Sequence, residues 1–83
     1  MKEKVIKLVG NKLEKLNVII DDVYIEKKGG VSTLYIVLDS DNIIDLDTVV
    51  KATDILNPIM DKSDLLDDID VLDIYAKEKG GEV

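Results

Sequence analysis

The chain has 83 residues, of which 46 % are hydrophobic, and it carries a net charge of −7. A chain this short buries enough apolar surface for one small core, so we expect a single folded domain over residues 1–83. The sequence contains neither Cys nor His. It therefore lacks the residues for a disulfide framework or a thiolate zinc site, and it lacks the commonest acid/base side chain. Most catalytic chemistry is excluded before any motif is considered.

The positive charge comes from lysine alone, because the chain contains no arginine. Residues 1–30 hold seven lysines against five acidic residues, a balance of +2, whereas residues 31–83 hold four against thirteen, a balance of −9. An acidic chain without arginine is a poor candidate for strong autonomous binding of nucleic acid. The acidic surface either keeps a small domain soluble or favours a basic partner protein. The sequence also lacks a membrane span and the apolar block of a signal peptide, so we expect a cytoplasmic protein.

Apolar residues recur at helical spacing near the N-terminus and predict a helix over residues 2–16. Gly10 lies inside this helix and weakens it by up to about 1 kcal/mol relative to Ala. Two β-branched and aromatic segments follow, at residues 18–26 and 31–38, and Lys27-Lys28-Gly29-Gly30 separates them. This pattern predicts a β-hairpin.

Turn-forming residues at 39–42 precede a second predicted helix, which Asp45 caps and in which Asp47 occupies the first turn. Its apolar stripe comprises Leu46, Val49, Val50, Thr53, Leu56 and Met60. Pro58 lacks a backbone N–H, so we expect the regular helix to end near Asn57, with an irregular turn over 58–62. After a polar connection, residues 69–76 read as a third strand, and the tail at 77–83 is expected to fray.

The element order α-β-β-α-β predicts an α+β fold in which two helices pack on one face of a three-stranded sheet. The strand period of two assigns the residues to two faces. Facing the helices we expect Ile19, Val23, Ile25, Leu34, Ile36, Leu38, Leu72, Ile74 and Ala76, covered by Val5, Val9, Leu13, Val50 and Leu56. On the open face we expect Val18, Ile20, Tyr24, Thr33, Tyr35, Val37, Val71 and Tyr75.

Runs of aspartate at 39–47 and 61–70 raise the question of acid/base or calcium chemistry. Carboxylates in solvated turns have no reason to acquire the raised pKa of a general acid. The first run fails as a calcium loop, because Ile44 stands where the loop needs Gly and Val50 where it needs Glu. Gly29-Gly30 lacks the spacing of a phosphate-binding loop. We therefore predict no catalytic residue, no metal site and no cofactor.

The three tyrosines are the only aromatic residues, and all are predicted on the open face. Three interpretations are open: the tyrosines stack on nucleic-acid bases, they simply cover the sheet, or they form a protein-docking patch. The acidic, arginine-free composition disfavours base stacking. The docking hypothesis makes the partner a basic protein, with weak self-association through the open face as a further expectation. Its candidate partner-binding residues are Tyr24, Tyr35, Val37, Val71 and Tyr75, together with Asp45 and Asp47.

Several segments, taken in order, are similar to a known family. They are residues 16–24, then Tyr24-Ile25-Glu26-Lys27-Lys28-Gly29-Gly30, Leu34-Tyr35-Ile36-Val37-Leu38-Asp39, Ile43-Ile44-Asp45-Leu46-Asp47 and Leu72-Asp73-Ile74. Over residues 4 to about 76 the chain resembles the N-terminal domain of the ribosome maturation factor RimP family. That resemblance implies a non-enzymatic factor that assists maturation of the small (30S) ribosomal subunit by contacting ribosomal protein and rRNA precursor.

The chain departs from the family pattern after its last strand. It reads Tyr75-Ala76-Lys77-Glu78-Lys79-Gly80 where family members have Ser-Ser-Pro-Gly, and the family's second, Sm-like domain is expected to be absent. The family has no catalytic or ligand residues to transfer to this sequence. The alternative function is a generic acidic module for protein interaction or oligomerisation, unrelated to ribosomes.

Overall fold

The computed structural model describes residues 1–77. Its elements, in chain order, are α1 (Lys2–Val9), a short 3-10 turn η1 (Glu14–Leu16), β1 (Ile19–Lys28), β2 (Val31–Asp39), α2 (Leu46–Lys62) and β3 (Val71–Ala76). The predicted α+β class, with two helices and a three-stranded sheet, is confirmed. Apart from Lys77, the segment predicted to fray lies outside the described residues.

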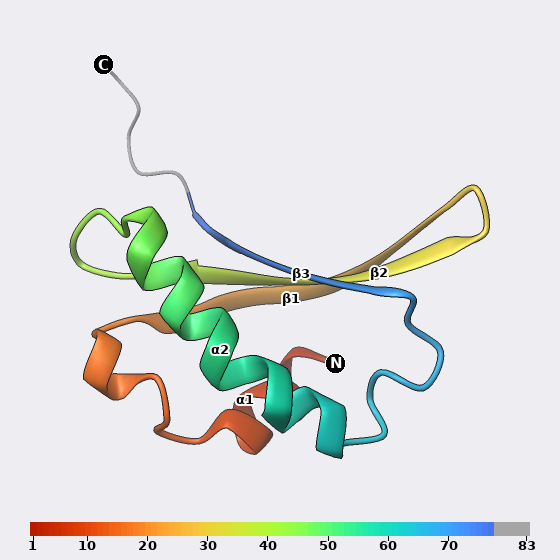
Figure 1. The fold of residues 1–83 in the computed structure, drawn as a ribbon, viewed down its shortest axis with the longest axis horizontal. Helices are drawn as coiled ribbons and strands as arrows, with labels where there is room; N and C mark the ends of the chain where they lie inside the picture. The colour runs from red at the N-terminus through yellow and green to blue at the C-terminus, as the bar shows by residue number, and fades with distance from the viewer. Residues whose placement is uncertain (78–83) are drawn as a thin grey trace.

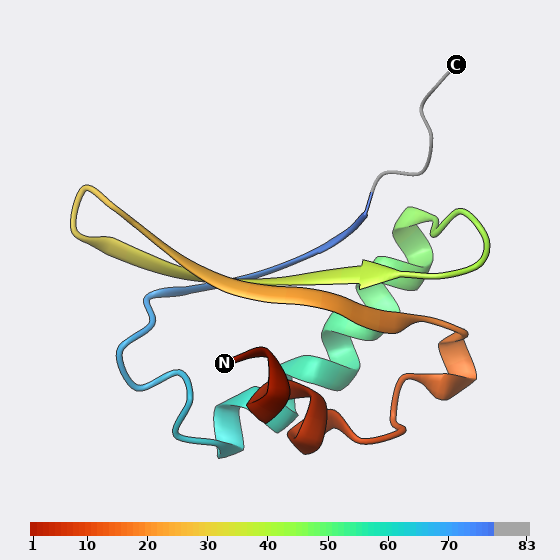
Figure 2. The ribbon, with the colours of Figure 1, turned by 180° about the vertical axis from the view of Figure 1, so that it is seen from behind.

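The sheet has the strand order β1-β2-β3 and is mixed. Strands β1 and β2 pair antiparallel, whereas β2 and β3 pair parallel because α2 lies between them in the chain. Both helices lie on one side of the sheet in Figure 1, and the opposite view in Figure 2 shows the same arrangement. No element of the described chain covers the other side of the sheet.

A two-residue turn joins β1 to β2. Gly29 and Gly30 have φ angles of 57° and 81°, a conformation that glycine adopts at little cost and that suits the right-handed twist of a hairpin. The paired strands extend to Lys28 and begin at Val31. The hairpin is therefore longer and tighter than the sequence pattern predicted.

The first helix is shorter than predicted. It ends at Val9, and Gly10 follows with φ 58° and ψ −128°, its N–H donating to the Ile6 carbonyl. Only glycine tolerates such angles readily, so the chain turns out of the helix here. The prediction of one helix over residues 2–16 is wrong, although Leu13 still reaches the core through the segment that follows.

The second helix is longer than predicted. It continues through Pro58 to Lys62, so the expected end near Asn57 is wrong. Proline removes the hydrogen bond to the carbonyl four residues earlier, at Asp54. Both Asp54 and Pro58 are exposed, so water can satisfy that carbonyl. The extra turn buries Met60 completely, which offsets the lost bond.

A β-bulge near the start of β1 reverses part of the predicted facing. Ile20 pairs with Leu38 and Asp22 with Val37, so Asp21 is an extra residue. Before the bulge the alternation is inverted: Ile19 is 64 % exposed, whereas Ile20 packs against the core. Val18, just before the strand, is buried too. The predicted faces of these three residues are wrong. From Val23 onward the alternation is regular, but Ile25, predicted to face the helices, is 48 % exposed because neither helix reaches over it, and Val37, predicted on the open face, is buried.

The core lies between the sheet and the two helices. Leu34, Ile36 and Leu38 of β2 are fully buried, in agreement with the prediction. On α2 the buried residues are Ala52, Leu56 and Met60, spaced four apart. Val50, predicted in the core, is 50 % exposed, because the buried stripe of α2 is narrower than its apolar pattern. The buried cluster comprises Val5, Val9, Leu13, Val18, Val23, Leu34, Ile36, Leu38, Ala52, Leu56 and Met60.

Candidate functional site

Three tyrosines from three strands meet on the open side of the sheet, and we call this surface the tyrosine face. Tyr24 and Tyr35 are direct cross-strand partners, and their rings stack with centroids 4.9 Å apart and an interplanar angle of 20°. Tyr75 of β3 meets Tyr35 edge-on, at 6.1 Å and 80°. Both arrangements are favoured by the charge distribution of aromatic rings. The three side chains therefore form one continuous aromatic cluster across the sheet.

The cluster is closed by a hydrogen bond between its outer members. The hydroxyl oxygens of Tyr24 and Tyr75 lie 2.7 Å apart, and each of these residues is 38 % exposed. Because this bond connects β1 to β3 across the central strand, it restricts the movement of both rings further. A rigid aromatic surface loses little side-chain entropy when a partner binds.

Carboxylates border the aromatic cluster. Glu26 is two residues along β1 from Tyr24, and its Oε1 accepts a long hydrogen bond of 3.5 Å from the Tyr35 hydroxyl. Asp73 is the direct partner of Tyr35 on β3. Neither acid was among the predicted site residues. The same period of two that placed the tyrosines also places Glu26 and Asp73 on this face, so the signal was present in the sequence.

The environment of the cluster shifts two tyrosine pKa values. The hydrogen bond with Tyr75, followed by partial burial, raises the pKa of Tyr24 from 10.0 to about 12. Partial burial raises the pKa of Tyr35, and the negative charges of Glu26 and Asp73 add to this. Both effects keep the phenols neutral, so the negative charge of the tyrosine face resides on its carboxylates.

The two predicted valines differ in what they offer a partner. Val71, at the start of β3, is 45 % exposed beside the cluster and pairs with Thr33. Val37 lies on the same face of the central strand but is only 6 % exposed. Val71 therefore adds contact area to the tyrosine face, whereas Val37 contributes mainly to packing.

The two acids among the predicted partner-binding residues lie outside the tyrosine face, at the N-terminal end of α2. The Asp45 side chain caps the helix by accepting from the Thr48 N–H at 2.8 Å. Hydrogen bonding with Thr48 lowers the pKa of Asp45. Asp47 pairs with Lys51 at 3.2 Å on an exposed surface. The structure therefore does not bring Asp45 and Asp47 together with the tyrosines, and Asp45 has a structural role at the helix start.

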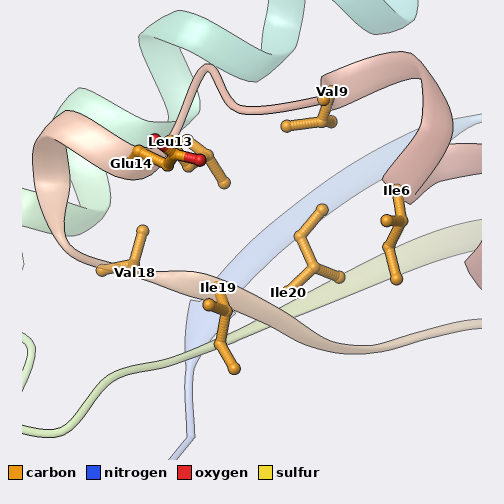
Figure 3. A pocket seen from close by; sticks show the side chains of 8 residues that line it. Ile6, Val9, Leu13, Glu14, Val18, Ile19 and Ile20 are labelled. Atoms are coloured by element: carbon orange, nitrogen blue, oxygen red, sulfur yellow. The ribbon is translucent and has the colours of Figure 1, made fainter.

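A separate apolar cleft lies between α1, the segment after it and the start of β1 (Figure 3). It has a volume of about 290 Å³. Figure 3 shows Ile6, Val9 and Ile20 around it, with Glu14 as the single ionisable residue in its lining. A single carboxylate in an apolar lining does not provide the several convergent polar groups that orient a reacting substrate.

Comparison with protein families identifies the family of this chain. The RimP N-terminal domain matches residues 8–80, nearly the whole sequence. The chain belongs to the RimP N-terminal domain family. The RimP family is one of ribosome maturation factors and is generally non-enzymatic. A comparison with curated proteins finds no match.

The described part of this RimP N-terminal domain shows neither a metal cluster nor a membrane-spanning helix. No group of three acidic residues within residues 1–77 is arranged to hold a metal ion. In the same part of the chain, no helix is long and apolar enough to cross a membrane. The tyrosine face is the surface on which ring contacts and a hydrogen bond join side chains from three strands.

Proposed function

We propose that this RimP N-terminal domain assists maturation of the small ribosomal subunit in the cytoplasm by docking a basic ribosomal protein on its tyrosine face. The family supplies the ribosomal context. The observation that carries the docking proposal is the joined cluster of Tyr24, Tyr35 and Tyr75 on an uncovered sheet. Tyrosine is enriched at protein interfaces because it buries a large ring while its hydroxyl keeps a polar partner.

The acids around the cluster favour a positively charged partner. Glu26 and Asp73 flank Tyr35 on the two outer strands. A lysine or arginine that approaches the cluster meets an aromatic ring and a carboxylate together, and both attract a cation. This local arrangement agrees with the balance of −9 over residues 31–83. An acidic partner would be repelled at the same place.

The same charges argue against free RNA as the principal ligand. Phosphates would face Glu26 and Asp73 on the tyrosine face, and the chain has no arginine to neutralise them. Contacts with rRNA precursor are therefore expected through the assembled subunit and not through the tyrosine face alone. Asp45 and Asp47, away from the face, act at longer range by drawing a basic partner toward the domain.

The partner class is tested by equilibrium binding of the domain to three ligands at two salt concentrations. The ligands are purified small subunits, their isolated basic proteins and naked rRNA. We expect binding to subunits and to at least one basic protein, with a strong loss of affinity at high salt. Naked rRNA that bound as tightly as protein would contradict the proposal.

The steering acids are tested by the double variant Asp45→Asn and Asp47→Asn, because asparagine preserves the helix cap while removing charge. The association rate with the basic protein should fall, with a weaker salt dependence and little change in the dissociation rate. The control is Glu3→Gln in the first turn of α1, within residues 1–30, where the charge balance is positive. An equal loss of association rate in the control would remove any special role for the α2 acids.

A further inference from the structure

The outer edge of β3 is an unprotected strand edge. Strand β3 pairs with β2 on one side only, from Thr33↔Val71 to Leu38↔Ala76. In Figure 1 β3 crosses in front of the other strands, and no element of the described chain lies beyond it. The Lys77 N–H donates to the Leu38 carbonyl of β2, as the regular parallel register requires. Strand alternation then directs the backbone groups of Leu72, Ile74 and Ala76 away from β2.

The two edges of the sheet differ in their protection. Strand β1 carries a bulge between Ile20 and Asp22 and ends in Lys27-Lys28, features that natural edges use to resist pairing with other chains. Strand β3 has a regular register over its six residues, with no proline and no lysine. An additional strand therefore meets fewer obstacles at β3 than at β1.

Acidic residues line the approach to this edge. Five aspartates and no lysine occupy residues 64–76, and all five are exposed. They are Asp64, Asp67, Asp68, Asp70 and Asp73. Within residues 1–77 none of them forms an ion pair, since the two pairs found there join other residues. This charge disfavours pairing with a second copy, which would bring two such acidic segments together, and it favours a basic strand.

We propose that the free edge of β3 binds an extended basic segment of a partner protein, which adds to the sheet as a fourth strand. The segment hydrogen-bonds through its backbone to the outward groups of β3. Its basic side chains lie on the side of Asp73, and its alternate side chains contact the half-buried Leu72 and Ile74 on the helix side. The expected pattern is alternation of basic and β-branched residues over about six positions, the length of β3.

This inference deepens the proposed function by giving the conformation of the docked segment. It rests on that function only for the ribosomal identity of the partner. The added strand lies next to Tyr75, so one partner can occupy the edge and the tyrosine face together. The probe that tests it is a synthetic nine-residue peptide of alternating lysine and valine, which needs no ribosomal component.

The experiment is a titration of the isotope-labelled protein with this peptide, followed by backbone amide signals. We expect the amides of Leu72, Ile74 and Ala76 to shift and to gain protection from hydrogen exchange. Methylating the peptide backbone nitrogens at one alternate set of residues should weaken binding by about tenfold or more, because those N–H groups face β3. Methylating the other set should have little effect. Equal effects of the two sets, or signals that shift elsewhere, would overturn the proposal.

The protein side is tested by Leu72→Pro, which removes the first outward N–H of β3, with Leu72→Ala as the matched control. The proline variant should bind the peptide several-fold more weakly than the alanine variant. The methylated peptides keep the test valid if Leu72→Pro fails to fold. Tyr35→Ala should leave binding of the peptide backbone intact, so loss of ribosomal binding in that variant with normal peptide binding would separate the two proposals.

Discussion

The hydroxyl oxygens of Tyr24 and Tyr75 lie 2.7 Å apart, although the residues are 51 positions apart in the chain. They meet because β1 and β3 flank the central strand, on which Tyr35 stacks with Tyr24. The contact depends on the complete fold: the hairpin, the crossover through α2 and the parallel register of β3 are all needed. The tyrosine face therefore forms only when all three strands are correctly paired.

The first prediction concerns the pH dependence of this contact. Because the folded pKa of Tyr24, about 12, lies above its ordinary value of 10.0, the stability contributed by its neutral hydroxyl is complete below pH 10 and is lost as the pH rises toward 12. A titration of tyrosinate absorbance should therefore show a late-ionising tyrosine that disappears in Tyr24→Phe. In Tyr75→Phe the pKa of Tyr24 should fall toward its ordinary value. A folded protein in which all three tyrosines ionise at the ordinary value would contradict the contact.

The second prediction concerns the core beneath the tyrosine face. Ile36 is fully buried on the central strand, so Ile36→Ala should lower the free energy of unfolding by about 2–5 kcal/mol by leaving a cavity. Ile43, which is 83 % exposed, provides the control, since Ile43→Ala should change the stability by less than about 0.5 kcal/mol. Denaturant unfolding measures both values. Equal effects of the two substitutions would place the core elsewhere.

The third prediction distinguishes the observed first helix from the one that the sequence pattern predicted. In a helix continuing to residue 16, Gly10→Ala would stabilise the protein by up to about 1 kcal/mol. At the observed φ of 58° and ψ of −128°, the alanine side chain is strained and the variant should be destabilised by about 1–3 kcal/mol. The sign of the change in unfolding free energy decides between them. Lys7→Ala, on the preceding exposed turn, should be close to neutral.

The fourth prediction is negative and concerns metals. Stabilisation by a ligand requires tight binding to the native state, and the described residues contain no cluster suited to a metal ion. Millimolar calcium or zinc should therefore raise the melting temperature by no more than about a degree or two. A larger increase would contradict this prediction and would indicate metal binding by the aspartates at residues 39–47.

The sequence predicted the fold class and the approximate position of every strand, because the period of two and the helical spacing are strong in this chain. It did not predict the bulge at Asp21, which has no sequence signature in Asp21-Asp22 and which inverted the faces of Ile19 and Ile20. Pro58 predicted a helix end that the structure does not have, because the burial of Met60 outweighs the one hydrogen bond that proline removes.

The strand period of two also predicted part of the candidate site. The tyrosines follow the bulge or lie on other strands, so alternation placed them on one face correctly. Their mutual distances depend on strand order, which periodicity does not specify. Glu26 and Asp73 share the period of two with the tyrosines, but the strand pattern alone does not distinguish a carboxylate at a site from an ordinary solvent-facing one. Asp45 and Asp47 lie at the start of α2, as their capping pattern predicted, and that position separates them from the tyrosine face.

The most direct test of the tyrosine face is the dissociation rate of Tyr35→Ala from purified small ribosomal subunits. Tyr35 lies at the centre of the cluster, so its removal should raise that rate at least about tenfold with little effect on the association rate. Tyr35→Phe keeps the ring and should stay close to wild type. Leu46→Ala is the control, since Leu46 is 78 % exposed on α2 and outside the face. A folded Tyr35→Ala variant that dissociates at the wild-type rate would contradict the account.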